Sequence, residues 1–503
     1  MAELFDAYEL GGFFDEAFNA EGNPRPSYQL LVDRLMALSP NELQRRERMR
    51  DGIFRSQGIT FMLYGDDDDV ERTFPMDLVP RIIPADEWSH IERGVTQRVT
   101  ALNRFLEDLY VGEQAALNDG IVPRWLVQTA DGFRREAFGI PVPHAARCLV
   151  SGVDLVRDGD GTYLVLEDNL RNPSGISYVL ENRAAMTRVL PVAFAQQRVR
   201  PVDHYGLMLL QALRSVAPPA AGEHPLAVVL TPGVYNSAYY EHAFLARQMG
   251  IELVEGRDLV VDEHVVYMRT TQGLRRVDVI YRRIDDDFLD PVVFHPDSAL
   301  GVPGMLSAAR AGNVTIANAV GNGVADDKAF YAFVPDLIRF YLGEEPILPN
   351  VRTYLLWNDE ERAEVLSRLS ELVVKPVAAS GGYGMLIGPT ADEQELREFH
   401  ARIENDPRGY IAQEVIALSR HPTLIDGKLE GRHIDLRPFA IAGETIQVIP
   451  GGLTRVALKR GSLVVNSSQG GGSKDTWVLE NNDPTSETAD MAMNQTADAV
   501  KEY

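Results

Sequence analysis

The segment that most constrains the fold is residues 371–388, which reads ELVVKPVAASGGYGMLIG. Its first apolar run, at 372–374, is typical of a buried strand, and a second apolar run follows the glycines at 385–387. Two strands joined by a glycine loop form a hairpin that can close over a ligand. The glycines let backbone N–H groups approach phosphate oxygens, and Lys375 adds a positive charge at the end of the first strand.

This segment has competing interpretations. An ordinary tight turn beside an exposed lysine fits it equally well, and the segment alone leaves that alternative open. A P-loop is excluded because no Gly-Lys-Ser/Thr follows the glycines. A dinucleotide-binding turn is excluded because the loop leads into a strand-like run, where that motif requires a helix.

The composition narrows the class of protein. The 503 residues suffice for roughly two to four domains, and 45% hydrophobic with 24% charged residues is ordinary for a soluble globular chain. No apolar run approaches the roughly 18 residues of a membrane span, and the N-terminal residues lack the pattern of a signal peptide. The net charge of −24 argues against general nucleic-acid binding but permits an anion such as ATP. We therefore expect a cytoplasmic protein with no membrane or nucleic-acid partner.

The single cysteine, Cys148, suits a reducing compartment. It lies in an apolar, strand-like run, so we expect a core residue, with a catalytic thiol as the alternative.

Residues 151–182 predict a hairpin that carries hard metal ligands. Asp154 lies in its first strand, Asp-Gly-Asp-Gly at 158–161 forms the turn, and Glu167 and Asn169 follow the returning strand. Glu167 and Asn169 are two residues apart and so share a face. Two carboxylates and an amide oxygen suit Mg²⁺, although the acids could also be a surface pair. Arg171, a little further on, could add a phosphate contact.

Residues 200–300 alternate strands and helices, which predicts a small parallel sheet. Strands are expected at 226–230 and 251–254, with a helix at 237–249 that ends at Gly250.

Two later runs in this region, 265–269 and 277–281, look like a hairpin. The second run is followed by four charged residues, Arg282, Arg283, Asp285 and Asp286. Ligands of α/β sheets bind at strand ends, so these residues are either a substrate contact or a surface salt-bridge cluster.

The remaining pattern is less specific. Further helices are expected at 28–38, 41–57, 87–110, 360–372 and 393–403, and further strands at 145–156, 410–417, 433–442, 450–457 and 463–466. Asp326 and Asp327 are expected to cap the helix that carries Lys328. Asp435 and Arg437 should share one face of their strand. The acidic run 66–69 is interpreted as a solvated turn.

Taken together, these segments resemble the ATP-grasp ligases in a rearranged order. The family's first motifs match, in order, Lys328, Lys375, the glycine loop, Gln413–Glu414, Asp435 with Arg437, Arg455 and the glycines at 470–472. Its closing motifs, Gly-Val-Asp at 152–154 and Glu-x-Asn at 167–169, lie upstream of Lys328. That order is similar to the circularly permuted ATP-grasp proteins (type 2), including the synthetase half of glutathionylspermidine synthase. A permutation only rejoins surface termini and leaves a site intact.

The resemblance implies an α+β chain with a circularly permuted ATP-grasp fold and a small α/β, pre-ATP-grasp-like domain. The expected parts are a mostly helical N-terminal region (1–140), a metal-binding part (141–200), the α/β domain (201–315), an ATP-binding part (316–480) and a mobile tail (481–503). It also implies that the 150–180 hairpin lies against the strands at 440–475, because the metal and nucleotide motifs must meet.

The resemblance further implies a role for each motif. ATP would contact Lys328, Lys375, the loop residues Ser380, Gly381, Gly382, Tyr383 and Gly384, and the hinge residues Gln413, Glu414 and Val415. Mg²⁺ would be held by Asp154, Glu167 and Asn169. Arg455 and Arg171 would stabilise the acyl phosphate and the tetrahedral intermediate.

The implied activity is ATP-dependent ligation of a carboxylate to an amine through an acyl phosphate, with release of ADP and phosphate. The substrates would be small molecules or peptides. A non-catalytic ATP-binding scaffold and an ATP-grasp phosphotransferase remain as alternatives. No cysteine-peptidase-like domain is evident at the N-terminus, so glutathione and spermidine are not assigned as substrates.

Overall fold

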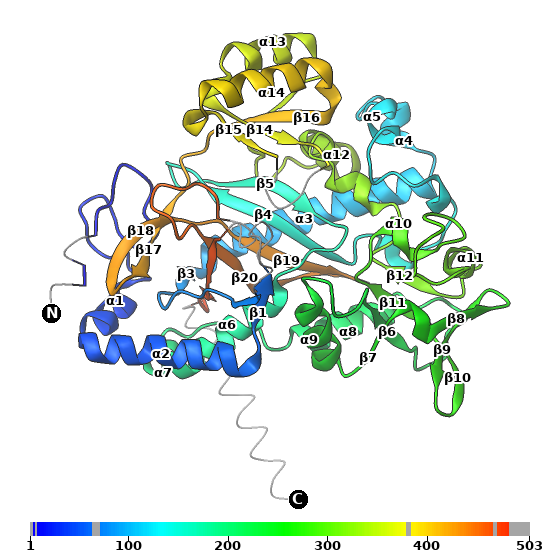
Figure 1. Cartoon of the computed structure of the whole chain (residues 1–503), viewed down its shortest axis with the longest axis horizontal. Coiled ribbons are helices and arrows are strands. Elements are labelled where there is room, and N and C mark those ends of the chain that lie inside the picture. The colour runs from blue at the N-terminus through cyan, green and yellow to red at the C-terminus, as the bar shows by residue number, and fades with distance from the viewer. Residues whose placement is uncertain (1–3, 6–7, 63–70, 379–383, 466–469, 482–503) are drawn as a thin grey trace, which may run out of the picture.

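A five-stranded antiparallel sheet joins two distant parts of the sequence (Figure 1). Its order is β21-β20-β19-β4-β5, formed by Gly472–Lys474, Ile446–Val456, Arg437–Ala442, Val150–Arg157 and Tyr163–Asn169. The β4–β5 hairpin thus lies against the C-terminal strands, which confirms the topological prediction. The structure is a computed structural model that describes residues 4–5, 8–62, 71–378, 384–465 and 470–481.

Helices cover both faces of this sheet. On one face α3 (Ala85–Tyr110) packs in one apolar cluster with Val153 and Leu155 of β4. On the other face α6 (Ile176–Val189) and α8 (Tyr205–Ser215) pack with β19 and β20. Seven of the eight β4 residues are therefore buried, which explains the nearly continuous apolar sequence of that strand. Because side chains alternate along a strand, Asp154 points to the face opposite α3.

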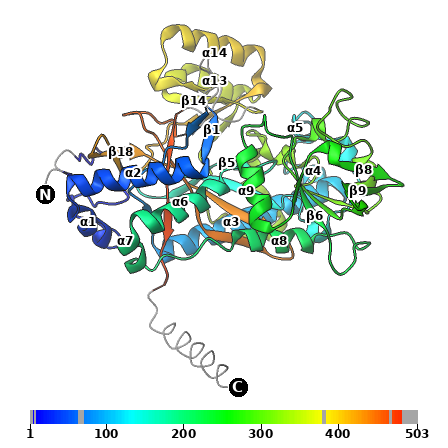
Figure 2. The same cartoon turned by 60° about the horizontal axis from the view of Figure 1, so that its bottom comes forward.

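A smaller sheet, which we call the lid sheet, lies above the five-stranded sheet (Figures 1 and 2). Its order is β13-β16-β14-β15, formed by Thr353–Leu355, Tyr410–Glu414, Leu372–Pro376 and Leu386–Ile387. Helices α13 (Asp359–Ser367) and α14 (Glu393–Asn405) cover its outer side. The predicted strand–loop–strand hairpin is confirmed, since β14 and β15 pair antiparallel.

The α/β unit contains the predicted parallel sheet. Its order is β12-β11-β6-β7, formed by Thr315–Ala317, Val279–Arg282, Ala227–Leu230 and Glu252–Val254. Helix α9 (Tyr239–Met249) ends where Gly250 takes a left-handed φ of 66°. The short helices α10 (Asp286–Leu289) and α11 (Met305–Arg310) complete the unit.

The predicted hairpin between 265–269 and 277–281 is wrong. Strand β9 (Val265–Thr270) pairs with β8 (Leu259–Asp262) and β10 (Gly273–Arg276), whereas β11 lies in the parallel sheet between β12 and β6. The strands differ in burial, since every residue of β11 is buried whereas β10, the strand that does pair with β9, is largely exposed. A tight turn at Gly273, with φ of 110°, lets β9 return on itself sooner than the apolar pattern indicates.

Much of the N-terminal region packs in one apolar cluster with α6 and with Trp477. Helices α1 (Gln29–Met36), α2 (Pro40–Gln57) and α3 agree with the predicted helices to within a few residues. Helix α2 begins at Pro40 because Ser39 and Glu42 form a capping box. The shorter elements are α4 (Ala115–Asn118), α5 (Arg124–Gln128), α7 (Pro191–Gln196), β1 (Thr60–Met62), β2 (Glu71–Thr73), β3 (Arg81–Ile83), α12 (Val334–Leu342), β17 (Arg420–Ile425), β18 (Lys428–His433) and β22 (Thr476–Val478).

Several local predictions differ from the structure. The expected strand 433–442 is divided, because β18 ends at His433 and β19 begins at Arg437. Residues 463–465 form no strand. The helix predicted at 360–372 ends at Ser367, because the chain turns before β14 begins. Lys328 precedes a 3-10 turn and is not in a helix, although Asp327 does accept the N–H groups of Ala329 and Phe330.

The predicted acidic turn at 66–69 and the predicted tail from 482 onward fall on residues outside the described ranges. Among the helices of the described ranges, none has the length and apolarity that a membrane span requires.

Candidate active site

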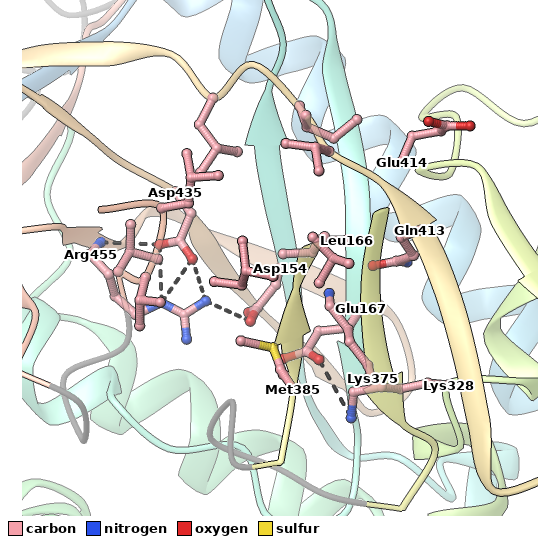
Figure 3. Close-up of a pocket in the computed structure, with 18 of the residues that line it drawn as sticks. Asp154, Leu166, Glu167, Lys328, Lys375, Met385, Gln413, Glu414, Asp435 and Arg455 are labelled. Carbon is pink, nitrogen blue, oxygen red and sulfur yellow. Dashed lines mark hydrogen bonds and ion pairs between the residues drawn. The ribbon is translucent and has the colours of Figure 1, made fainter. Parts of the chain in front are cut away.

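A cavity of about 160 Å³ lies between the lid sheet and the five-stranded sheet (Figure 3). Much of its wall is apolar: Leu166, Val373, Met385, Ile387, Ile416, Leu418, Leu463, Val464 and Val465. Its charged lining residues are Asp154, Glu167, Lys328, Lys375, Glu414, Asp435 and Arg455. An apolar wall with convergent charges suits a ligand that has both a flat apolar part and an anionic part.

Lys375, on β14, carries its amine into this cavity in an unusual state. Only 9% of the residue is exposed, and its amine has no hydrogen bond or ion pair within the described part of the chain. The pKa of Lys375 is lowered to about 8, mainly by burial and in smaller part by Lys328 and Arg455, while Glu167 and Asp154 partly oppose the shift. A buried amine without a paired carboxylate favours an anionic ligand, which would restore its charge balance.

Two aspartates and two arginines form a closed cluster beside the cavity, and Figure 3 shows three of them, Asp154, Asp435 and Arg455. Arg437 donates to both oxygens of Asp154, from Nε at 2.5 Å and from Nη2 at 2.8 Å. Arg455 bridges Asp154, at 2.6 Å, and Asp435, at 2.9 Å from its Nε. Burial alone would raise the pKa of Asp154, but the two guanidinium groups outweigh it and hold that pKa well below its ordinary value. Arg455 still has one nitrogen, Nη1, without a partner among the described residues.

The predicted metal ligands are only partly brought together. Glu167 faces Asp154 across the β4–β5 ladder, and Asn169 faces Gly152. Glu167 lines the cavity and lies 3.7 Å from the Lys328 ammonium, whereas Asn169 is not among the lining residues. The amide nitrogen of Asn169 is buried without a partner in the described part of the chain. Within the described residues no group of three or more His, Cys, Asp or Glu is placed to hold a metal ion.

These contacts determine which oxygen atoms are available to a hard cation such as Mg²⁺. Glu167 and Asn169 offer oxygen atoms that no guanidinium group occupies, in keeping with the ligands of Mg²⁺. Asp154 differs, because both of its oxygens already accept from Arg437 or Arg455. It could join a metal only after an arginine releases it.

Gln413, on β16, has a free acceptor. The residue is 2% exposed and lines the cavity, and its amide nitrogen donates to Thr353 Oγ1 at 3.0 Å. The Thr353 hydroxyl donates its proton to the Val351 carbonyl, so it can only accept from Gln413. The Gln413 group that faces it is therefore the NH₂. The amide oxygen of Gln413 is consequently left buried without a donor among the described residues. A ligand amine would satisfy it.

The Glu414 side chain is committed elsewhere. Its carboxylate accepts from the Tyr354 hydroxyl at 2.6 Å and from Arg368 at 3.1 Å, and it points away from the cavity (Figure 3). Burial and the hydrogen bond to the Glu414 carboxylate raise the pKa of Tyr354 to about 12. What β16 offers the cavity beyond Gln413 is therefore its continuing chain, with Val415 among the lining residues.

The other predicted site residues lie outside the cavity wall or the described ranges. Arg171 is not among the lining residues, and its Nε donates to Asp326 at 2.8 Å. Of the glycine loop, Ser380, Gly381, Gly382 and Tyr383 fall outside the described ranges, and Gly384 is exposed with φ of 70°. Cys148 is fully buried and burial raises the pKa of its thiol, which favours the core interpretation.

Sequence reasoning missed a β-bulge beside the cavity. Asp154 pairs with Glu167 but Leu155 pairs with Val165, so Leu166 is an extra residue in β5. The bulge brings both Leu166 and Glu167 to the cavity wall. Spacing alone carries no signal for it. Thr353, which orients Gln413, was also missed, since only the pairing of β13 with β16 reveals the contact.

Comparison with known proteins points to one family. The family model described as circularly permuted ATP-grasp type 2 matches residues 80–457. An uncharacterized protein of Synechocystis sp. is 56% identical over 475 residues, covering 94% of this chain and 98% of that protein. A Frankia alni protein named "Putative glutamate--cysteine ligase 2-3" is 47% identical over 475 residues, covering 94% of this chain but only 54% of that protein.

Among solved structures, a glutathione synthetase-like effector from Globodera pallida, in its apo form, has a similar fold. The TM-score is 0.56 at 12% identity, and the match covers 88% of this chain and 98% of the effector.

Proposed function

Because the chain belongs to the circularly permuted ATP-grasp family, type 2, we propose that it is an ATP-dependent carboxylate–amine ligase. It would activate a carboxylate as an acyl phosphate, join it to an amine and release ADP and phosphate. One observation carries the proposal, namely the buried, unpartnered amine of Lys375 in a cavity that also presents apolar surface. That combination suits a nucleotide better than a wholly apolar or wholly polar ligand.

Each end of ATP has partners in this proposal. The adenine ring lies against the apolar wall, and its 6-amino group donates to the free amide oxygen of Gln413. Lys375 and Lys328 bind the phosphates. The glycine loop 380–384 is proposed from the sequence alone to cover them, because its backbone N–H groups can approach closely.

Mg²⁺ would be held by Glu167 and Asn169, with Asp154 as a third ligand once an arginine has moved away. The ion supplies charge neutralisation on the phosphoryl oxygens, which such transfer requires.

The residues of the chain orient the reaction. In the first step a substrate carboxylate oxygen attacks the γ-phosphorus, and the bond to the ADP oxygen breaks. In the second step the amine nitrogen attacks the acyl carbon, and phosphate leaves. Arg455 presents its unpartnered Nη1 to the negative charge of both transition states, and Asp154 and Asp435 fix its orientation.

An amino acid or peptide is the proposed substrate class. Two Frankia relatives, both 47% identical to this chain, carry the name glutamate–cysteine ligase, which describes amino-acid ligation. The match covers 54% of each of those proteins, so the name supports the class of substrate and not these two amino acids. A cytoplasmic location suits the single buried thiol.

The test supplies Mg-ATP, hydroxylamine and each of the twenty amino acids in turn. Hydroxylamine converts an acyl phosphate to a hydroxamate, which is detected with Fe³⁺, while chromatography separates ADP from AMP. Wild type should give hydroxamate and ADP with at least one amino acid, and Glu167→Ala should give neither. Glu252→Ala is the matched control, since Glu252 is an exposed glutamate on the distant strand β7.

Each alternative has its own signature in this assay. Phosphorylated product without hydroxamate would indicate a phosphotransferase, and ATP binding without any turnover would indicate a scaffold. Equal hydroxamate yields from wild type and Glu167→Ala would show the metal assignment to be wrong.

A further inference from the structure

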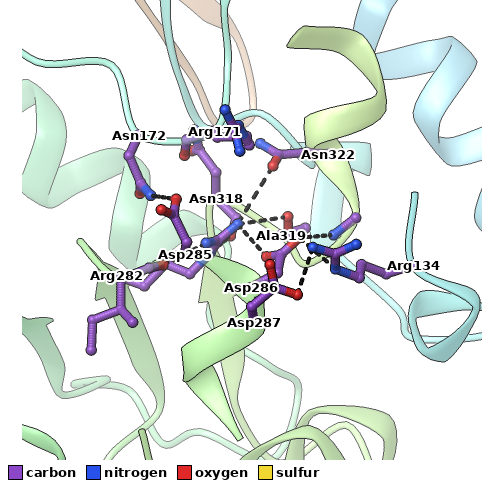
Figure 4. A network of polar contacts seen from close by, with 12 residues as sticks. Arg134, Arg171, Asn172, Arg282, Asp285, Asp286, Asp287, Asn318, Ala319 and Asn322 are labelled. Atoms are coloured by element: carbon purple, nitrogen blue, oxygen red, sulfur yellow. Dashed lines mark hydrogen bonds and ion pairs between the residues drawn. The ribbon is translucent and has the colours of Figure 1, made fainter. Parts of the chain in front are cut away.

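A polar network lies at the carboxyl end of β11, where ligands of parallel sheets bind (Figure 4). Its deep part is buried and is held by hydrogen bonds and an ion pair. Arg282 is fully buried and donates to the carbonyls of Asn318, at 2.7 Å, and Ile284, at 2.6 Å, and it pairs with Asp286 at 2.8 Å. Arg282 and Asp286 are therefore neither a surface cluster nor an open site, and they serve to hold the loops together.

The outer edge of the network, which we call the rim, consists of Asn172 and Asp285. It differs from the deep part because two of its hydrogen-bond acceptors lack donors among the described residues. Asn172 donates its amide N–H to one oxygen of Asp285 at 3.1 Å. That contact fixes the orientation of the amide, so Asn172 Oδ1 points the other way, where it is buried without a donor in the described part of the chain. Asp285 is exposed, and its second oxygen has no partner among the described residues. Two acceptor oxygens at the rim thus lack donors.

Two contacts connect the rim with the proposed catalytic centre. Asp326 accepts the backbone N–H groups of Leu170, at 2.5 Å, and Arg171, at 3.2 Å. Lys328, two residues later, lies 3.7 Å from Glu167. The segments 167–171 and 326–328 therefore run together, and Asn172, which contacts Asp285, directly follows the first of them.

Fixed groups hold this rim in place. Arg283, which is 6% exposed, donates to the Pro173 carbonyl at 3.0 Å and so supports the turn that carries Asn172. Arg171 is fixed by Asp326 through its Nε, while its two terminal nitrogens have no partner in the described part of the chain. The Arg171 guanidinium and the Asp285 carboxylate, each with free positions among the described residues, are close enough to interact electrostatically and complement a ligand that carries both charges.

We infer that Asp285, oriented by Asn172 and adjoining Arg171, binds the ammonium group of the amine substrate; the inference rests on the proposed ligase function. The free, exposed oxygen of Asp285 matches an N–H donor, and the cation of an amine matches the carboxylate. Arg171 lies on the catalytic side, where it meets a carboxylate or the acyl phosphate. An α-amino acid or the N-terminus of a peptide fits as the acceptor.

The reaction balances with the acceptor bound in this way. The ammonium nitrogen loses two protons as its bond to the acyl carbon forms and the acyl carbon–oxygen bond breaks. One proton leaves with the phosphate as HPO₄²⁻, and the other passes to water by way of the exposed Asp285 carboxylate.

The test compares two nucleophiles in Asp285→Asn. Hydroxylamine is small and uncharged near pH 7.5, so it needs no ammonium site, and its hydroxamate yield should stay within about twofold of wild type. With an amino acid as the acceptor, the KM should rise by about ten- to a hundredfold, because one charge-assisted hydrogen bond is lost. Asp262→Asn, at an exposed position on β8, is the matched control and should change neither value.

Binding gives a second readout that does not depend on turnover. Saturation-transfer NMR with Mg-ADP and each of the twenty amino acids should show at least one ligand whose signal disappears in Asp285→Asn. An equal loss with both nucleophiles, or amino-acid binding that ignores the substitution or is absent in wild type, would overturn the inference. Absence of hydroxamate from wild type, with Asp285-dependent binding intact, would instead count against the ligase function alone.

Discussion

Replacing Lys375 by methionine should stabilise the protein while it weakens ATP binding. Burial and neighbouring cations lower the pKa of this amine from 10.5 to about 8. At pH 7 the folded chain therefore holds a charge that its surroundings disfavour, at a cost of roughly 3 kcal/mol, since one pKa unit corresponds to about 1.4 kcal/mol. Methionine is similar in length and carries no charge, so it removes that cost.

The cost has a defined pH dependence. It is fully present below about pH 8, where the folded and unfolded chains both carry the proton. It disappears as the pH rises from about 8 to 10.5, because the folded chain releases its proton first and the unfolded chain still binds it. The stability advantage of Lys375→Met should therefore shrink by roughly 2 to 3 kcal/mol between about pH 7 and pH 10.

Urea unfolding at pH 7, 8.5 and 10 measures this advantage directly. Lys428→Met is the control, since Lys428 is an exposed lysine on β18, and its difference from wild type should not change with pH. Calorimetry on the same proteins should show ATP binding about ten- to a hundredfold weaker in Lys375→Met, because a charge-assisted bond is lost. An advantage that is constant with pH, or unchanged ATP affinity in the folded variant, would refute the reasoning.

Three further predictions concern the same cavity. ATP affinity of wild type should be constant below about pH 8 and fall above it, as the Lys375 amine loses its proton, whereas calorimetry on Lys375→Met should show no such fall. Gln413→Met should lower the affinity for ATP about tenfold but leave that for GTP unchanged, because only adenine has a 6-amino donor; an unchanged ATP/GTP ratio would count against this placement. Asp154→Asn should destabilise the protein by about 3 to 5 kcal/mol in urea unfolding, because two buried guanidinium groups lose a carboxylate; a loss below about 1 kcal/mol would show the cluster to be loosely held.

Much of the architecture could be predicted because the motifs depend on local sequence. The glycine hairpin at β14–β15, the β4–β5 hairpin and the parallel sheet each follow from apolar runs and turn residues. The union of β4 with β19 was predictable for a different reason. A metal motif at 154–169 and a lysine at 375 serve one ligand only if the chain brings them together.

The partners of individual side chains were beyond the reach of the sequence. Asp154 and Arg437 are 283 residues apart, and neither segment contains a pattern that predicts their pairing. Strand β11 and the run at 265–269 share an apolar pattern, yet only the burial of β11 places it in the inner sheet. Glu414 matched a hinge motif, but Tyr354 and Arg368 occupy its carboxylate. In each case a contact between distant segments decides the role.

The central claim is that ATP activates a carboxylate as an acyl phosphate. The most direct test supplies the carboxylate substrate from the hydroxamate screen with ¹⁸O in both carboxylate oxygens, together with Mg-ATP and the amine. Mass spectrometry of the products should find one ¹⁸O in the released phosphate, because a carboxylate oxygen bridges to the transferred phosphorus and leaves with it. Label in AMP would indicate an adenylate, and unlabelled phosphate would mean that ATP is cleaved without forming the acyl phosphate, which would contradict the claim.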